Sequence, residues 1–137
     1  MAAELFVDAS AWYPLIVRAV PQHDLVTAAL RSAVRHGARL VTTNLVVAET
    51  HALLLRRTSA EIALAFVRGL TAPYTLVVRS TAELERTAIT DWLERYEDQE
   101  FSLADAVSFA VMTERGIRDA LTLDRHFAAA GFRSVPG

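Results

Sequence analysis

The sequence predicts a single α/β domain over residues 1–137, built around a mainly parallel sheet of four or five strands. Short apolar runs such as residues 5–7 show no polar alternation, which is typical of strands buried on both faces of a sheet. These runs alternate with helical segments, as in βαβ units. The length of 137 residues and the apolar fraction of 53% suffice for one hydrophobic core.

Hydrophobic spacing, capping residues and turn residues place the individual elements along the chain. Strands are expected at residues 5–8, 39–42, 74–78 and 119–123, with an edge strand at 132–135. Helices are expected at residues 10–18, 22–36, 44–57, 59–70, 81–96 and 102–115, and their expected N-caps are Ser10, Thr43 or Asn44, Ser59, Ser80 and Ser102. For the helix at 22–36 the predicted inner face is Leu25, Ala28, Ala29, Ser32 and Val34. Gly37 and Gly116 are expected to end the helices that precede them.

Composition excludes several kinds of chemistry. All 14 basic residues are arginine, so neither a Schiff-base lysine nor a P-loop lysine is present. Cysteine is absent, which excludes thiol catalysis and a zinc–thiolate site. A net charge of −2 argues against non-specific coating of nucleic acid. With no membrane-spanning run and no signal-peptide pattern, we expect a cytoplasmic protein that has no membrane partner.

Two aspartates are expected at the carboxyl ends of strands. Asp8 follows the first strand and Asp124 follows the strand at residues 119–123. In open α/β sheets, ligands bind beyond the carboxyl ends of the strands, so both side chains are placed where a site would form. The alternative for Asp8 alone is that it ends the strand or stabilises a turn.

Glu49 is expected within a helix, on a stripe of apolar residues. Its neighbours at three- and four-residue spacing are Val46, Leu45, Ala52 and Leu53. A carboxylate in such surroundings is costly to bury without a partner. Either Glu49 is a ligand in a site, or it forms an ion pair with Arg56 or Arg57.

Asp105 lies in the first turn of the helix at residues 102–115. Together with Ser102 it forms the Ser-x-x-Asp pattern of a capping box, and the helix dipole also favours a negative charge there. The capping role is compatible with a role in a site, because a residue at a helix start can face the same cleft as the strand ends.

Clustered carboxylates repel one another unless a cation compensates their charge. Hard oxygen ligands select Mg²⁺ or Mn²⁺ over zinc, and one or two such ions suit phosphodiester hydrolysis. None of the four histidines shows metal-ligand spacing. His126, however, is close enough to Asp124 in the sequence to contact a substrate.

Four segments of the chain resemble the motifs of the PIN-domain family, and within it the VapC-type toxins of bacterial toxin–antitoxin pairs. They are residues 6–11 (FVDASA), 43–50 (TNLVVAET), 101–112 (FSLADAVSFAVM) and 121–127 (LTLDRHF). All four occur in the family's order and span nearly the whole chain. The resemblance implies a three-layer α/β/α sandwich and an endoribonuclease that depends on Mg²⁺ or Mn²⁺.

The resemblance also implies roles for particular residues. It assigns the acidic catalytic and metal-binding positions to Asp8, Glu49, Asp105 and Asp124, with Ser10 and Thr122 as supporting hydroxyls. Arg18, Arg125 and His126 are weaker candidates for contact with the RNA backbone. The implied products carry 5′-phosphate and 3′-hydroxyl ends. The implied partners are RNA, a cognate antitoxin and a second copy of the chain in a homodimer.

Two rival interpretations of the resemblance remain open: a PIN nuclease that processes RNA without being a toxin, and a PIN scaffold that binds without catalysis. The presence of all four acids argues against the scaffold. A receiver-like phosphoacceptor domain also places acids at strand ends, but it requires a lysine at a strand end, and the chain has none.

Overall fold

The computed structural model of the chain describes residues 3–71 and 75–137. Within these residues one five-stranded sheet has the order β3-β2-β1-β4-β5, and every neighbouring pair is parallel. The strands are β1 (Glu4–Val7), β2 (Arg39–Thr43), β3 (Thr75–Val78), β4 (Asp119–Leu121) and β5 (Arg133–Val135). The predicted parallel sheet is confirmed, including the edge strand. Tyr74, predicted to begin the third strand, lies outside the described residues.

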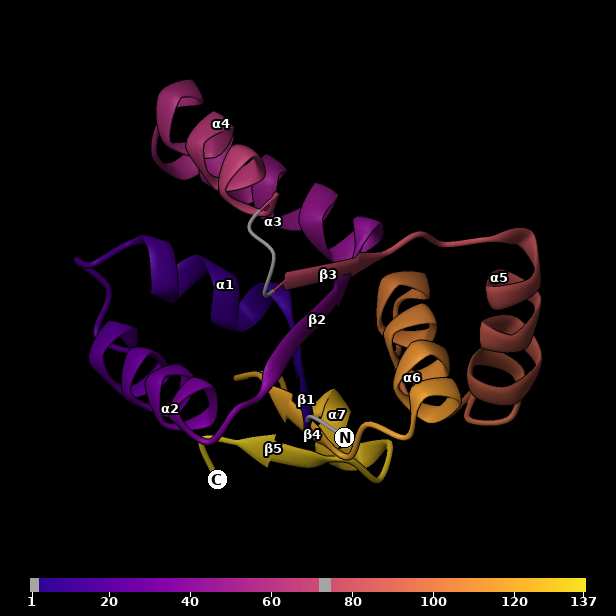
Figure 1. Cartoon of the computed structure of the whole chain (residues 1–137). Coiled ribbons are helices and arrows are strands. Elements are labelled where there is room, and N and C mark those ends of the chain that lie inside the picture. The colour runs from indigo at the N-terminus through magenta and orange to yellow at the C-terminus, as the bar shows by residue number, and fades with distance from the viewer. Residues whose placement is uncertain (1–2, 72–74) are drawn as a thin grey trace.

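Helices cover both sides of the sheet (Figure 1). They are α1 (Ala9–Ile16), α2 (His23–Arg35), α3 (Asn44–Arg57), α4 (Ala60–Gly69), α5 (Ala82–Ala88), the π-helix η1 (Ile89–Glu94), α6 (Leu103–Arg115) and α7 (His126–Ala129). In this view α1 and α2 lie to the left of the strands and α5 and α6 to the right, while α3 and α4 pack together at the top. The predicted α/β/α architecture is confirmed. No helix in the described ranges is long and apolar enough to cross a membrane.

Side-chain caps fix where most helices begin. Thr43 rather than Asn44 caps α3, since Thr43 Oγ1 accepts a hydrogen bond from the Val46 amide at 3.1 Å. The predicted caps Ser59 and Ser102 are confirmed. Two predictions are wrong by one or two residues. Asp8 caps α1 in place of Ser10, and Thr81 caps α5 in place of Ser80.

The buried face of α2 differs from the predicted one. Val26 is fully buried, whereas the predicted Leu25 and Val34 are 54% and 47% exposed. Both the stripe through Leu25 and the stripe through Val26 contain apolar residues at helical spacing. Only the packing of the helix against the rest of the protein decides between them.

The predicted single helix at residues 81–96 consists of α5 followed by the π-helix η1. A π-helix has wider turns than an α-helix and so changes which residues face a neighbouring element. Here the ring of Trp92 packs against Phe109 at 5.1 Å and against Phe132 at 5.9 Å between centroids. The short helix α7 was not predicted, and β4 ends at Leu121, two residues earlier than expected.

Aromatic packing holds the first turn of α6 close to the segment that follows β4. Phe109 of α6 contacts Phe101 and Phe127, each at 5.0 Å between ring centroids and close to perpendicular. Phe109 and Phe127 are fully buried, as is Phe6 of β1. This cluster fixes the positions of α6, α7 and β1 relative to one another.

Two glycines provide a test of how the ends of helices are specified. Gly116 ends α6 with φ +72°, a conformation that strains any residue with a Cβ, whereas Gly69 in α4 has no such φ. In both places a Cβ would meet nothing within 4 Å. We therefore expect Gly116→Ala to lower the free energy of unfolding by about 1 kcal/mol, and Gly69→Ala to leave it unchanged or raise it by up to about 1 kcal/mol. Denaturant unfolding of both variants measures this, and equal effects would contradict it.

Candidate metal centre

The carboxyl ends of the five parallel strands lie on one edge of the sheet, and Asp8 stands there directly after β1. Its side chain is only 6% exposed. Two hydroxyl groups hold the same carboxylate oxygen, Oδ2: Ser10 Oγ donates at 2.7 Å and Thr122 Oγ1 donates at 3.2 Å. The Ser10 amide also contacts this oxygen at 3.3 Å. Asp8 is therefore fixed in orientation by groups from two segments of the chain.

The same hydroxyls determine the path of the chain after β4. Ser10 Oγ accepts a hydrogen bond from the Leu123 amide at 2.9 Å, and Thr122 Oγ1 accepts one from the Asp124 amide at 3.0 Å. These bonds hold the backbone of Asp124 beside the end of β1. The supporting positions that the resemblance indicated for Ser10 and Thr122 correspond to direct contacts with Asp8.

Asp105 enters the same region from the first turn of α6. The capping box is present: the Asp105 amide donates to Ser102 Oγ at 3.0 Å, and the Ser102 amide donates to Asp105 Oδ2 at 3.2 Å. Asp105 Oδ2 also lies 3.0 Å from His126 Nδ1. Asp105 thus combines the predicted capping role with a place in the acidic cluster.

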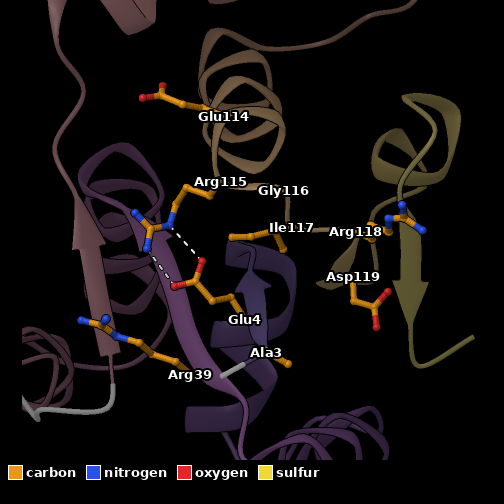
Figure 2. A pocket seen from close by; sticks show the side chains of 9 residues that line it. All are labelled: Ala3, Glu4, Arg39, Glu114, Arg115, Gly116, Ile117, Arg118 and Asp119. Carbon is orange, nitrogen blue, oxygen red and sulfur yellow. Dashed lines mark hydrogen bonds and ion pairs between the residues drawn. The ribbon is translucent and has the colours of Figure 1, made fainter. Parts of the chain in front are cut away.

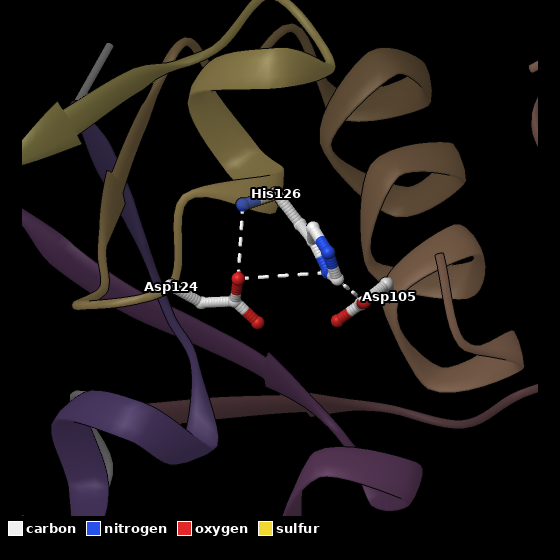
Figure 3. Close-up of side chains that lie close together, drawn as sticks. All are labelled: Asp105, Asp124 and His126. Atoms are coloured by element: carbon white, nitrogen blue, oxygen red, sulfur yellow. Dashed lines mark hydrogen bonds and ion pairs between the residues drawn. The ribbon is translucent and has the colours of Figure 1, made fainter. Parts of the chain in front are cut away.

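His126 lies between two of the carboxylates (Figure 3). Its Nδ1 is 3.0 Å from Asp105 Oδ2 and 3.5 Å from Asp124 Oδ1, and its backbone amide donates to Asp124 Oδ1 at 2.9 Å. The sequence suggested only a possible contact with substrate for this residue. The role in the cluster was missed because Asp105 and His126 are 21 residues apart and only the fold brings them together.

Glu49 lies on α3, within the predicted helix, and it is exposed, so the cost of burying its carboxylate among apolar residues does not arise. The predicted alternative of an ion pair with Arg56 or Arg57 is also absent among the described residues. Desolvation, followed by the charges of Asp8, Asp105 and Asp124, raises the pKa of the Glu49 carboxyl. Although the residue as a whole is exposed, its carboxyl group is partly desolvated and lies near three other carboxylates, and this distinguishes it from an ordinary surface glutamate.

Asp8 shows the strongest conflict between burial and charge. Burial raises the pKa of the Asp8 carboxyl, and the negative charge of Asp105 adds to that effect. The hydrogen bonds from Ser10 act in the opposite direction. An ionised carboxylate at this position therefore lacks the compensation that a nearby cation would give.

The donor set fits a hard divalent cation. In the described part of the chain, no arginine nitrogen lies within 4.0 Å of the Asp8, Glu49, Asp105 or Asp124 carboxylates. Atoms from Asp105, Asp124 and His126 lie within 4.8 Å of one another, which is close enough for a shared ion. Asp8 and Glu49 are not in that compact group. They are close enough for the charge of Asp105 to raise the pKa of Asp8, and for the charges of Asp8, Asp105 and Asp124 to raise the pKa of Glu49.

The two arginines suggested for contact with RNA are not part of this cluster. Arg18 is exposed beyond the far end of α1, a helix of 8 residues and therefore about 12 Å long, so the structure does not bring it to Asp8. Arg125 is exposed in the loop between Asp124 and His126 and so borders the site. Its contact with RNA stays a prediction.

A separate cavity of about 870 Å³ opens at the opposite edge of the sheet, where the strands begin (Figure 2). Its lining includes Glu4, Arg39 and Asp119, the first residues of β1, β2 and β4. Glu4 is engaged by Arg115 through two hydrogen bonds of 3.0 and 2.8 Å. The arginine-paired Glu4 here contrasts with the acids at the carboxyl edge, which have no arginine partner in the described residues.

A parallel α/β/α fold with acids gathered at the carboxyl edge agrees with the PIN-domain resemblance, and the model of that family matches residues 5–133. The chain belongs to the PIN-domain family. It is similar to the 23S rRNA-specific endonuclease VapC20 of Mycobacterium tuberculosis, at 37% identity over 131 residues, covering 96% of this chain and 97% of that protein. It is also similar to ribonuclease VapC26 of the same organism, at 32% identity over 127 residues, covering 91% of this chain and 90% of VapC26.

The solved structures give the same relationship. The crystal structure of M. tuberculosis VapC20, described as a sarcin–ricin loop cleaving toxin, superposes with a TM-score of 0.85 at 35% sequence identity. The match covers 93% of this chain and 95% of that one. The resemblance to VapC-type toxins that the four motifs suggested is therefore confirmed.

The raised pKa of Asp8 predicts how the stability of the metal-free protein depends on pH. The folded state binds this proton more tightly than the unfolded state, so ionisation of Asp8 destabilises the fold, and lowering the pH through the raised pKa restores stability. Asparagine keeps the N-cap acceptor without the charge. We expect Asp8→Asn to raise the free energy of unfolding at pH 7 in EDTA by the order of 1 kcal/mol, and this gain to shrink as the pH falls towards about 4.

The control for this measurement is Glu4→Gln, for which the opposite sign is expected. The hydrogen bonds and the charge of Arg115 lower the pKa of Glu4, so its ionised form stabilises the fold at neutral pH. Denaturant unfolding in EDTA from pH 4 to 7 compares the two variants with wild type. A loss of stability in Asp8→Asn at pH 7 would show that the carboxylate is not under electrostatic strain.

Proposed function

We propose that this protein is a metal-dependent endoribonuclease that hydrolyses RNA phosphodiester bonds and acts as the toxin of a toxin–antitoxin pair. The observation that carries the proposal is the group of four carboxylates without an arginine counter-charge, in a fold that superposes on a toxin that cleaves RNA. VapC20 is named as specific for 23S rRNA and as cleaving the sarcin–ricin loop. RNA containing that loop is therefore the first substrate to test here.

Asp8, Asp105, Asp124 and Glu49 are the proposed ligands of one or two Mg²⁺ or Mn²⁺ ions. Such an ion, when bound, activates water and stabilises the negative charge that develops on the phosphate during in-line displacement. The residues themselves do the positioning. Ser10 and Thr122 hold Asp8 Oδ2, the capping box holds Asp105, and the His126 amide holds Asp124. Hydrolysis in this arrangement is proposed to leave 5′-phosphate and 3′-hydroxyl ends.

Contact with the RNA backbone is assigned to residues at the border of the acidic cluster. Arg125 is exposed next to Asp124, and the side chain of His126 is 20% exposed. Arg18 is a more distant candidate that only an extended RNA would reach.

The proposed partners are a cognate antitoxin and a second copy of the chain. Both partners need apolar surface for a stable interface, and α3 and α4 expose Leu55, Ile62, Leu64 and Val67. We place the activity in the cytoplasm, where the RNA substrate is found. Mass measurement of the purified protein, alone and co-expressed with the product of a neighbouring small gene, tests both partners.

The first test of this function is RNA cleavage. We expect wild type with Mg²⁺ or Mn²⁺ to cut RNA containing the sarcin–ricin loop at a defined position, and EDTA to abolish the cut. Asp8→Asn should reduce the single-turnover rate by at least about 100-fold, because loss of a metal ligand removes several kcal/mol of transition-state stabilisation. The matched control is Asp98→Asn, which changes an exposed loop acid and should cleave at the wild-type rate.

Two outcomes would contradict the proposal. If folded, antitoxin-free wild type is inactive with both metals on this RNA and on a broader panel of structured RNAs, the chain is a binding scaffold instead of a nuclease. If Asp8→Asn cleaves as fast as wild type, the acidic cluster is not the site of the reaction.

The hydroxyl of Ser10 provides a separate test of how Asp8 is oriented. Ser10→Ala removes the 2.7 Å hydrogen bond to Asp8 Oδ2 and the acceptor of the Leu123 amide. We expect the cleavage rate and the metal affinity to fall together by about 10–100-fold, the usual effect of losing a partner that orients a ligand. Ser32→Ala, on the exposed side of α2, is the control. Unchanged metal affinity in Ser10→Ala would mean that the Ser10 hydroxyl is not needed to orient Asp8, and that burial, Thr122 and the Ser10 amide suffice.

A further inference from the structure

We infer that the imidazole Nδ1 of His126 is itself a ligand of the divalent cation and gives the site a preference for Mn²⁺ over Mg²⁺. This inference rests on the proposed function, since it concerns the ion of the same site. It goes beyond that function by adding a nitrogen donor to a set otherwise made of carboxylates, and by separating two cations that carboxylates alone serve about equally well.

The distances around His126 Nδ1 match those between neighbouring ligands of one ion. Two ligands at right angles, each about 2.1 Å from a common octahedral ion, lie about 3.0 Å apart. His126 Nδ1 lies 3.0 Å from Asp105 Oδ2 and 3.5 Å from Asp124 Oδ1. Ligand atoms of these three residues all fall within 4.8 Å of one another. Among the described residues, these three form the single group of three or more possible metal ligands that lie this close together.

The imidazole ring is held in this orientation by contacts that do not involve the carboxylates. Its ring packs against Phe101 at 5.4 Å between centroids, edge to face at 77°. The next residue, Phe127, is fully buried against Phe109 and Phe6, which fixes the backbone of α7. The side chain keeps 20% exposure, so an ion and its water can reach the nitrogen.

An imidazole nitrogen among carboxylate ligands accounts for the preference for Mn²⁺ over Mg²⁺. Imidazole is a softer ligand that binds first-row transition-metal ions better than it binds Mg²⁺, whereas carboxylate and water suit Mg²⁺ and Mn²⁺ alike. Mg²⁺ gives up its water reluctantly and binds through one or two carboxylates, so it gains little from a nitrogen ligand. Mn²⁺ accepts both kinds of ligand. A neutral His126 that binds through Nδ1 carries its proton on Nε2, where it can donate to water or to a phosphate oxygen.

The competing interpretation of the same distances is a hydrogen bond from Nδ1–H to Asp105. In that case His126 would only orient Asp105, and no nitrogen would touch the ion. The two interpretations differ in measurable ways. A directly bound nitrogen couples far more strongly to the unpaired electrons of Mn²⁺ than one outside the coordination shell, and only a nitrogen ligand changes the preference between the two metals.

The experiment uses the full chain with three substitutions. His126→Asn retains a hard oxygen ligand near the position of Nδ1 but removes the imidazole. His126→Phe removes any ligand and keeps a ring that can pack against Phe101. His36→Asn is the control, because that histidine is exposed at the end of α2 and its ring hydrogen-bonds to the backbone oxygen of Ser32, away from the acids. Mn²⁺ affinity is measured by the loss of the free-ion EPR signal, Mg²⁺ affinity by competition, and nitrogen ligation by pulsed EPR.

We expect ¹⁴N modulation from a bound imidazole in wild type and in His36→Asn, and its loss in both His126 variants. The Mn²⁺ dissociation constant should rise about 10–100-fold in His126→Asn, because losing a ligand costs at least as much as losing a residue that orients a ligand. The Mg²⁺ dissociation constant should change less than about threefold. Wild type that binds Mn²⁺ without ¹⁴N modulation, or an unchanged ratio of affinities in His126→Asn, overturns this inference and leaves the nuclease proposal intact. Wild type that binds neither metal overturns both.

Discussion

The repulsion among the carboxylates at the carboxyl edge of the sheet is the constraint on which the site depends. Asp8 is almost completely buried, Asp105 lies close enough to raise its pKa, and the charges of Asp8, Asp105 and Asp124 raise the pKa of Glu49. In the described residues the single basic side chain within 4.0 Å of this group is His126. Such an arrangement is costly in the free protein and becomes favourable when a divalent cation binds. The arrangement thus lowers the stability of the metal-free fold and provides a preorganised binding site.

The rest of the fold makes this repulsion tolerable by fixing each acid through a separate local device. Asp8 is an N-cap that receives two hydroxyl bonds, Asp105 belongs to a capping box, and Asp124 is held by the amide of His126. Each device satisfies carboxylate oxygens with hydrogen-bond donors that carry no charge. The aromatic cluster around Phe109 then holds α6, α7 and β1 together, so the repulsion between the acids cannot be relieved by movement of these elements.

Local sequence signals predicted most of the fold and the positions of three acids, because caps, strand ends and glycine stops depend on residues close together in the chain. The Asp105 capping box, the cap at Thr43 and the Gly116 stop are of this kind. Features that depend on distant packing were missed. They include the buried stripe of α2, the π-helix that turns Trp92 towards Phe109, the exposure of Glu49, and the contact between His126 and Asp105.

The central claim is that a divalent cation neutralises these carboxylates, and anomalous X-ray diffraction from crystals grown with Mn²⁺ tests it most directly. The account predicts a manganese peak within bonding distance of carboxylate oxygens from at least two of Asp8, Asp105 and Asp124, and a weaker peak in Asp8→Asn at the same Mn²⁺ concentration. A clean map without manganese between these residues, at a concentration that supports RNA cleavage, would contradict it.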